Sequence, residues 1–363
     1  MYDQIQEDLL YMAFYGAAAM LSLAACCYLL FRRANAIAPD VTPPVRLRRW
    51  TAAFFAAMTF SHAWYMPVVF HSSSDDVWLS YLVGALLDFM ILIPLAIIVL
   101  LTMLQDRRRP LWPVAVMAAP PVVIITWCLV SNSNAPLRWL YTYMLLLGVG
   151  LIIYMVRAVR QYGRWLRDNY ADLEHKEVWQ SFVVLTVILL IFGFYSYGVR
   201  GPVYQYIIQF NDIVLICYLL WRVETLSELS ISQPQSLPIA EPATAQTTYD
   251  NIGSLLQQHC IDTQLYLQHD LNLIQLAKAI GTNRFYLSQY FSSLGMSYNA
   301  YINDLRINHF ISLYHDAIAA QSSFTVQQLA QESGFRSYTT FISAFKSKTG
   351  QSVRSWIKTA NKA

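Results

Sequence analysis

Apolar residues form long uninterrupted runs through the first part of the chain, and further along they recur at helical spacing among polar residues. Up to Trp221 each run is about twenty residues long, the length that an α-helix needs to cross roughly 30 Å of hydrocarbon. Seven such runs are recognisable, at about residues 10–31, 50–70, 78–104, 111–131, 137–156, 178–199 and 203–221. Beyond Pro234 the pattern is that of ordinary amphipathic helices. The sequence therefore predicts an all-α protein, in which a polytopic seven-helix transmembrane bundle precedes a second helical domain.

Arginine and lysine residues are concentrated in alternate loops between these runs. The loops after the first, third and fifth runs carry five, three and five of them, whereas the other segments carry only Arg138 and Arg200. Basic loops stay in the cytoplasm, so we expect the N-terminus outside and the C-terminal domain in the cytoplasm. The composition agrees, because 56% hydrophobic and 13% charged residues make the chain more apolar than a water-soluble protein needs to be.

The membrane bundle is expected to cover residues 1–222, and the second domain residues 249–363. Residues 223–248 combine a short helical extension with a linker rich in proline, glutamine and serine, which predicts an extended tether. Leu226 and Leu229 would lie on one side of the extension, where they are available to pair two protomers. A homodimer is therefore one expectation.

Three ionisable residues lie deep inside the apolar runs, namely His62, Asp88 and Asp212. Gln209 and Asn211 accompany them in the last run, and the ionisable residues all lie at a similar depth from the predicted outer surface. Charged groups at membrane depth are costly, which makes them candidates for function. The five residues form either an outward-open polar pocket, which binds a small ligand or senses protonation, or an interhelical hydrogen-bond cluster that only holds the bundle together.

The apolar region carries no recognisable catalytic or metal-binding chemistry. The chain has no lysine before Lys176, which excludes a retinal Schiff base, and it has no HExxH or GxSxG motif. His71 lies near Asp75 and Asp76, a grouping more typical of a solvated loop than of a metal site. The five cysteines show neither zinc-ligand spacing nor a disulfide framework, and we expect them to be small buried residues. No enzyme activity, cofactor or metal is expected.

A first helix-turn-helix unit is predicted in the C-terminal domain. Leu273–Ile280 is its first helix, Gly281-Thr282 is the turn, and Asn283 is the N-cap of the second helix. Leu287 and Phe291 are four residues apart in that helix and should face the core of the domain. Its outward positions are Arg284, Phe285, Ser288 and Gln289.

A second unit of the same kind begins at Val326. Its first helix ends at the Ser333-Gly334 corner, and its second helix starts with Ser337 as the N-cap. Phe341 and Phe345 again repeat four apart and should be buried. The outward positions are Tyr338, Thr339, Ile342 and Ser343, with the basic residues Lys346 and Lys348 beside them. Both outward sets lie where a recognition helix shows its side chains to the major groove.

The domain resembles the DNA-binding domain of AraC-type (AraC/XylS-like) regulators over about residues 250–358. The resemblance rests on Leu276-Ala277, Asn283-Arg-Phe-Tyr-Leu-Ser-Gln-Tyr-Phe291, Gly295-Met-Ser, Tyr301-Ile, Leu305-Arg306-Ile, Leu329-Ala330-Gln331-Glu332-Ser333-Gly334-Phe335 and Phe341–Gly350. It implies two recognition helices held about one DNA turn apart. The outward residues of both helices would read bases, Lys346 and Lys348 would contact phosphate, and Arg306 would be a structural ion-pair partner. The chain departs from the family at Leu329, which replaces isoleucine, and at Ser352-Val353, which replaces a Thr-Pro corner.

These features together predict a membrane-embedded, one-component transcription regulator of the bacterial inner (cytoplasmic) membrane. Its partners would be double-stranded promoter DNA, membrane lipid, and a small ligand or a partner membrane protein. Two alternatives remain open. The bundle is a passive anchor that docks to a partner sensor, or it is a transporter with a regulatory DNA-binding domain, although the sequence shows no internal repeat.

Overall fold

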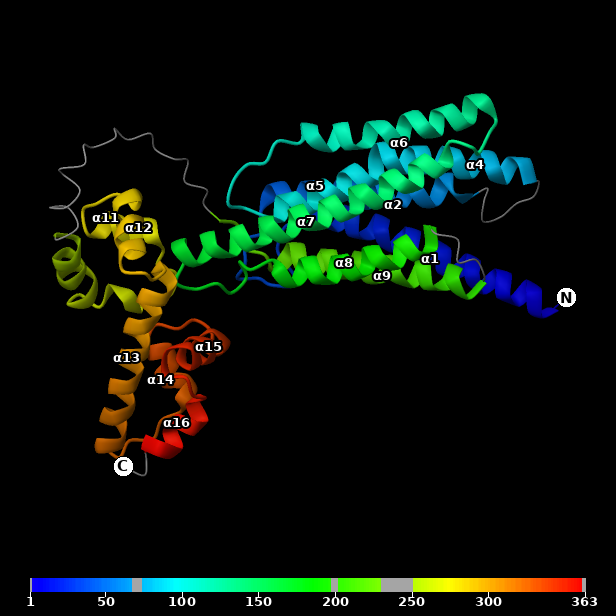
Figure 1. Cartoon of the computed structure of the whole chain (residues 1–363). Helices are drawn as coiled ribbons and strands as arrows, with labels where there is room; N and C mark the ends of the chain where they lie inside the picture. Colours follow the sequence, from blue (N-terminus) through cyan, green and yellow to red (C-terminus); the bar gives the residue numbers. More distant parts are fainter. Residues whose placement is uncertain (1, 67–73, 197–201, 230–250, 361–363) are drawn as a thin grey trace, which may run out of the picture. The chain divides into compact units, whose positions relative to one another are not determined.

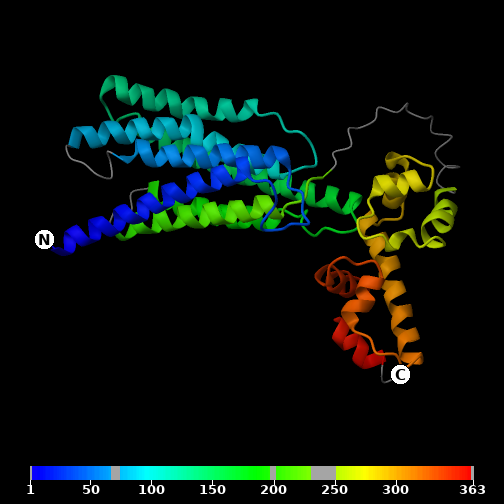
Figure 2. The same ribbon diagram turned by 180° about the vertical axis from the view of Figure 1, so that it is seen from behind.

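The computed structural model describes residues 2–66, 74–196, 202–229 and 251–360, in which the regular structure is helical apart from one isolated β-bridge (Figures 1 and 2). The predicted all-α class is confirmed. The chain divides into two compact units, Met1–Arg160 with Val178–Ile231, and Gln161–Glu177 with Ser232–Ala363. The expected tether at 232–248 and the residue His71 lie outside the described residues.

The first unit contains the apolar helices. They are α1 (Tyr2–Phe31), α2 (Val45–Trp64), α4 (Ser74–Leu87), α5 (Ile93–Met103), α6 (Trp112–Ser131), α7 (Leu137–Asn169), α8 (Trp179–Ser196) and α9 (Pro202–Thr225). Helix α1 packs against α2 and α9, α2 also packs against α5, and α8 packs against α9. Each of the seven expected runs therefore corresponds to one helix or, for the third, to α4 and α5 together.

Among the described residues, five helical stretches are long and apolar enough to cross a membrane, namely Leu9–Phe31, Trp78–Met103, Trp112–Ser131, Leu137–Asn169 and Gln205–Thr225. Helix α2, whose first two turns carry three arginines, is not among them. Helix α8 contributes a shorter apolar stretch within the described part of the chain. Length and composition thus support five spans, and the number seven stays a prediction.

Many large apolar side chains of this unit are exposed, among them Trp112, Trp127, Val130 and Leu146. Extensive exposed apolar surface is typical of a membrane-facing protein, because lipid makes burial of these side chains unnecessary. Two of the cysteines lie on such faces. Cys27 and Cys217 are exposed, whereas we expected all five to be buried; Cys26, Cys128 and Cys260 are indeed buried.

The third apolar run is interrupted at Asp88. Residues Asp88–Leu92 form a π-helical turn between α4 and α5, and Pro94 stands in the first turn of α5. Proline has no backbone N–H and crowds the carbonyl one turn earlier, so a wider turn before it relieves the ladder of hydrogen bonds. The irregular turn therefore places Asp88 at the one point where the backbone of this run departs from an α-helix.

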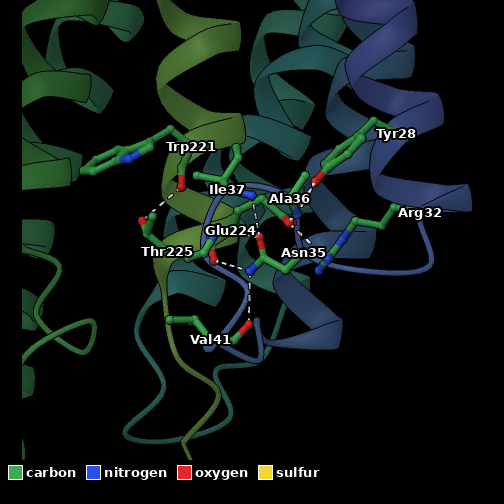
Figure 3. Close-up of polar contacts among 10 residues, drawn as sticks. Tyr28, Arg32, Asn35, Ala36, Ile37, Val41, Trp221, Glu224 and Thr225 are labelled. Carbon is green, nitrogen blue, oxygen red and sulfur yellow. Dashed lines mark hydrogen bonds and ion pairs between the residues drawn. The ribbon is translucent and has the colours of Figure 1, made fainter.

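The last turn of α9 is held by residues that follow α1. Asn35 donates through Nδ2 to the carbonyl oxygens of Val41 (3.0 Å) and Glu224 (2.8 Å), as Figure 3 shows. Glu224 is completely buried and pairs with Arg32 at 3.1 Å. Helix α9 ends at Thr225, one turn beyond its expected membrane end.

The residues beyond Thr225 differ from the expected helical extension. Leu226 and Leu229 are buried, at 0% and 5% exposed, and the chain there is not helical. Gln105 fixes it by donating to the carbonyl of Ser227 and accepting from the backbone N–H of Leu229, both at 2.9 Å. Because the two leucines are used within one chain, they are not available to pair protomers in this conformation.

The second unit contains the two helix-turn-helix units. Its helices are α11 (Leu273–Ala279), α12 (Arg284–Ser293), α13 (Tyr298–Ala319), α14 (Val326–Glu332), α15 (Tyr338–Thr349) and α16 (Val353–Ala360). Helix α13 joins the two halves (Figure 1). Its first half contributes Tyr298 and Ile302 to one core, and its second half contributes Ile307, Phe310 and Tyr314 to the other. One helix thereby fixes the distance between the two helix-turn-helix units.

Residues 161–177, the end of α7 and the connection to α8, belong to this second unit. Ala171 is fully buried in the core of the first helix-turn-helix unit, and Tyr170 forms an antiparallel β-bridge with Asn272. The sequence had assigned these residues to the membrane domain. The difference arises because an alanine in a polar loop carries no sign of a partner one hundred residues away.

Candidate DNA-binding surface and buried polar cluster

Asparagine side chains start both helices of the first helix-turn-helix unit. Asn283 is the N-cap of α12, as predicted, and its Oδ1 accepts from the backbone N–H of Tyr286 at 3.0 Å. Asn272 caps α11 together with Gln275 in a reciprocal capping box. The turn between the helices passes through Gly281, whose φ of +72° suits glycine. The caps fix the direction in which α12 presents its outward face.

The second helix-turn-helix unit depends on a glycine for a steric reason as well. Gly334 has φ +88°, and a Cβ atom there would lie 2.8 Å from the backbone of Leu267. Thr325 caps α14 by accepting from the N–H of Gln328. Ser337 occupies the N-cap position of α15, as predicted, but its side chain forms no capping hydrogen bond among the described residues. The close approach at Gly334 therefore does more than the Ser337 cap to set the start of α15.

The inward and outward positions of both second helices agree with the helical pattern. Leu287, Phe291, Phe341 and Phe345 are buried, at 2% exposed or less. Within the described part of the second unit, five large apolar side chains are exposed: Phe285, Leu294, Ile318, Tyr338 and Ile342. Three of these belong to the predicted base-reading sets, on α12 and α15. Apolar side chains shown to water at two matching places indicate surfaces made for contact.

The polar members of the same sets are placed unequally. Thr339, Ser343 and Gln289 are exposed, and Ser288 is half-buried. Arg284 is also half-buried, because its Nε donates to Oδ1 of Asn169 at 2.9 Å. Sequence reasoning missed this partner, for which the local pattern offers no signal.

The basic residues beside α15 also differ from one another. Lys346 is exposed, as a phosphate contact requires. Lys348 donates to the carbonyl of Asp304 at 2.8 Å and lies 3.7 Å from the Asp304 carboxylate, so it ties α15 to α13. Arg336 pairs with Asp270 at 3.3 Å on the surface.

Arg306 links the two halves of the domain from inside. It is 1% exposed, and it donates through Nε to the carbonyl of Tyr266 (2.8 Å) and through Nη2 to that of Gln268 (2.7 Å). The guanidinium also lies 5.7 Å from the ring centre of Phe335. Burial lowers the pKa of Arg306, while Asp172 and Asp270 favour its charged form and act in the opposite direction. The hydrogen bonds of the guanidinium go to two carbonyls, so these carboxylates act on the charge without the close ion pair that was expected. Its role is structural, since none of these contacts faces outward.

Comparison with known proteins agrees with this geometry. A known protein family described as "Helix-turn-helix domain" matches residues 276–359. Residues 276–359 form an AraC-type helix-turn-helix domain. Such a domain binds DNA and serves transcription regulation, and it is not an enzyme domain. The chain matches no curated protein and no solved structure.

The AraC-type domain tolerates both departures from its family pattern. Leu329 is buried, at 4% exposed, in the core of the second helix-turn-helix unit. Leucine fits there because its volume is close to that of isoleucine. Ser352 replaces the threonine of the corner, and its hydroxyl accepts from the backbone N–H of Ser355 at 3.2 Å. Val353 packs in the same core at 6% exposed. The corner before α16 is therefore maintained without a proline.

Three of the five candidate residues in the first unit come together. The His62 Nε2 atom lies 3.3 Å from Oε1 of Gln209 and 4.0 Å from Oδ2 of Asp212, which joins α2 to α9. All three side chains are buried, at 5–8% exposed. Nδ1 of His62 lies 2.8 Å from the Met58 carbonyl, so Nδ1 is the nitrogen placed to carry a proton. Tyr15 of α1, which sequence reasoning missed, donates to the carbonyl of His62 at 2.6 Å.

The other two candidates have separate partners. Asn211 donates to the carbonyl of Ile188 on α8 at 3.4 Å. Asp88 accepts from the hydroxyl of Tyr65 at 2.8 Å through Oδ2, while its Oδ1 is buried with no hydrogen-bond partner in the described structure. The described contacts therefore favour a central His62–Gln209–Asp212 cluster over one site shared by all five residues.

Proposed function

We propose that the protein is a membrane-embedded, one-component transcription regulator, whose AraC-type domain reads promoter DNA in the cytoplasm under control of a signal sensed in or across the membrane. The observation that carries this proposal is the pair of exposed faces on α12 and α15 in the same chain as five helices apolar enough to cross a membrane. No separate sensor protein is needed to connect signal and DNA, because one polypeptide holds both.

The two faces suit successive major-groove surfaces of one site. Helix α13 holds them at a fixed separation, as two half-sites one turn apart require. Arg284 and Gln289 have the groups that hydrogen-bond guanine and adenine, and Phe285 and Ile342 offer apolar contact to thymine methyl groups. Lys346 supplies a phosphate contact that positions the domain without reading sequence.

The sensing element that we propose is the His62–Gln209–Asp212 cluster. It contains ionisable groups on two neighbouring helices, so protonation or a polar ligand would change the contacts between α2 and α9. Helix α9 continues without interruption from Asp212 to Glu224, roughly 18 Å along its axis. Glu224 is the buried partner of Arg32 and Asn35 (Figure 3). A shift of α9 at the cluster would therefore be transmitted to the point where the chain leaves the bundle.

The DNA-reading part is tested by selection from a random DNA pool, with the full chain held in lipid nanodiscs. We expect enrichment of a bipartite motif with half-sites about 10 base pairs apart. An enriched motif that disappears in an Arg284→Ala, Tyr338→Ala double variant supports direct readout by both helices. Recovery of the unselected pool at every round would contradict it.

The sensing part is tested with Asp212→Asn in cells, with membrane fractionation as a check on insertion. We expect regulation of neighbouring genes to become independent of growth conditions, while the protein stays in the membrane fraction. Asn211→Ala is the matched control, because this neighbour bonds to α8 instead of His62. Unchanged regulation in Asp212→Asn would favour the passive-anchor alternative, and the same fractionation reports whether the chain is in the membrane at all.

A further inference from the structure

The connection between α7 and α8 is built into the AraC-type domain. Ala171 is 0% exposed among core residues of the first helix-turn-helix unit. Nδ2 of Asn299 donates to the carbonyls of Tyr170 and Ala171, at 3.2 and 2.6 Å, and Nδ2 of Asn303 donates to the Ala171 carbonyl at 3.3 Å. These contacts, with the Tyr170–Asn272 bridge, give the segment a defined docking place on α13 and α11.

The docked segment engages the first recognition helix. Oδ1 of Asn169 accepts from Nε of Arg284 at 2.9 Å, and Asn169 is itself only 6% exposed. Its Nδ2 donates to the carbonyl of Trp165 at 2.6 Å, which fixes the orientation of the amide. Arg284 is consequently half-buried, whereas its neighbour Phe285 is 64% exposed. The arginine best suited to read guanine is thus turned toward the protein.

The same segment also reaches the second recognition helix, where it places a negatively charged carboxylate. Oδ1 of Asp172, a carboxylate only 4% exposed, lies 3.5 Å from the hydroxyl of Thr340 on α15. Residues 161–177 contain four carboxylates, at 168, 172, 174 and 177, and three basic residues, Arg164, Arg167 and Lys176. That lysine lies over the ring of Tyr170 at 5.6 Å, and burial lowers its pKa. A phosphate approaching α15 at Thr340 would meet the Asp172 carboxylate, which repels it.

We propose that residues 161–177 are an autoinhibitory segment, which in the docked state holds Arg284 on α12 through Asn169 and places the Asp172 carboxylate beside α15, so that DNA binding requires its release. This inference rests on the proposed function. The segment is covalently continuous with α7 on one side and α8 on the other. Movement of these helices would release the segment, and α8 packs against α9, the helix that carries Gln209 and Asp212 of the sensing cluster.

The test is DNA binding by the full chain in nanodiscs, with a labelled random-sequence duplex of about 30 base pairs as the probe, enough for two half-sites with flanks. The variant is Asn169→Ala with Asp172→Asn, which frees Arg284 and removes the charge beside Thr340. We expect about two- to tenfold tighter binding, the effect of one or two hydrogen bonds. Asp168→Asn is the matched control, since it removes the same charge from an exposed position of the same segment, and it should change affinity less.

Hydrogen exchange of the same samples provides a second measurement. Addition of the duplex should increase exchange of the backbone amides in residues 161–177, because the segment leaves the domain. Binding by the double variant that is unchanged or weaker than that of the parent chain would overturn the inhibitory role, as would DNA binding with the segment still protected. If neither the parent chain nor the variants bind any duplex, the DNA-reading function itself fails, and inhibition fails with it.

Discussion

The two helix-turn-helix units share one design but depend on different parts of the chain. The second unit builds its core from its own helices and α13, around the rings of Phe310, Phe341 and Phe345. The first unit takes Ala171 into its core from a loop about one hundred residues earlier. The core of the second helix-turn-helix unit therefore forms without this segment, whereas the core of the first is completed by it. This difference is the basis of our proposal that control of DNA binding acts on the first helix-turn-helix unit.

The largest effect is expected from Phe310→Ala. Phe310 is 0% exposed and its ring lies 4.6 Å from that of Phe341 and 5.8 Å from that of Phe345. Loss of a buried phenylalanine costs about 3–5 kcal/mol, so exchange of the α14 and α15 amides should accelerate strongly. Phe285→Ala, at an exposed position, is the control and should leave these rates unchanged. If α11 and α12 lost protection first in Phe310→Ala, the core of the second helix-turn-helix unit would not be separate from that of the first.

Gly334→Ala should destabilise the domain more than Gly281→Ala does. Both glycines have positive φ, so alanine at either site is strained by about 1–2 kcal/mol. A Cβ at Gly334 would also lie 2.8 Å from the Leu267 backbone, whereas nothing lies within 4 Å of one at Gly281. Denaturant unfolding of the full chain, followed by exchange in the second unit, measures the difference. Equal destabilisation by the two variants would show that the close approach relaxes freely.

Arg284→Ala should alter sequence preference, and Lys346→Ala should not. A side chain that reads a base contributes about 1–3 kcal/mol to discrimination against the wrong base. Loss of a phosphate contact instead lowers affinity for all sequences and makes the salt dependence shallower by about one unit. Competition between selected and scrambled duplexes at several salt concentrations separates the two effects. An unchanged motif in Arg284→Ala would remove α12 from base reading.

The smallest effects concern the caps. Asn283→Ala removes an observed capping hydrogen bond and should cost about 1 kcal/mol. Ser337→Ala removes a side chain without such a bond, and we expect a few tenths of a kcal/mol. Local exchange of the first turns of α12 and α15 in the two variants makes the comparison. A larger loss at Ser337 would indicate that the cap bond forms in solution.

Local pattern was sufficient for much of the AraC-type domain. Helical spacing placed Leu287, Phe291, Phe341 and Phe345 in the core, and glycine and asparagine chemistry marked the turn and cap before α12. These features depend on neighbours within one or two helical turns, which a single sequence displays directly. The exposed apolar residues of α12 and α15 could be predicted for the same reason.

Contacts between distant segments could not be predicted in this way. Nothing around Asn169 indicates that it accepts from Arg284, and nothing around Leu226 or Leu229 indicates burial beside Gln105. The ionisable residues of the apolar runs could be recognised because placing such groups in a membrane costs free energy. Their partners Tyr15 and Tyr65 could not be recognised, since tyrosine is common in such helices. Sequence thus identified which residues were candidates, while the fold decided which of them meet.

Chromatin immunoprecipitation of the full-length protein, expressed from its own gene and recovered from the membrane fraction, tests the central claim most directly. We predict discrete occupied sites that share a bipartite motif, and loss of these sites in the Arg284→Ala, Tyr338→Ala double variant at equal protein level. Absence of enriched sites under every growth condition, or sites that persist in the double variant, would contradict the proposal that this chain reads DNA from the membrane through α12 and α15.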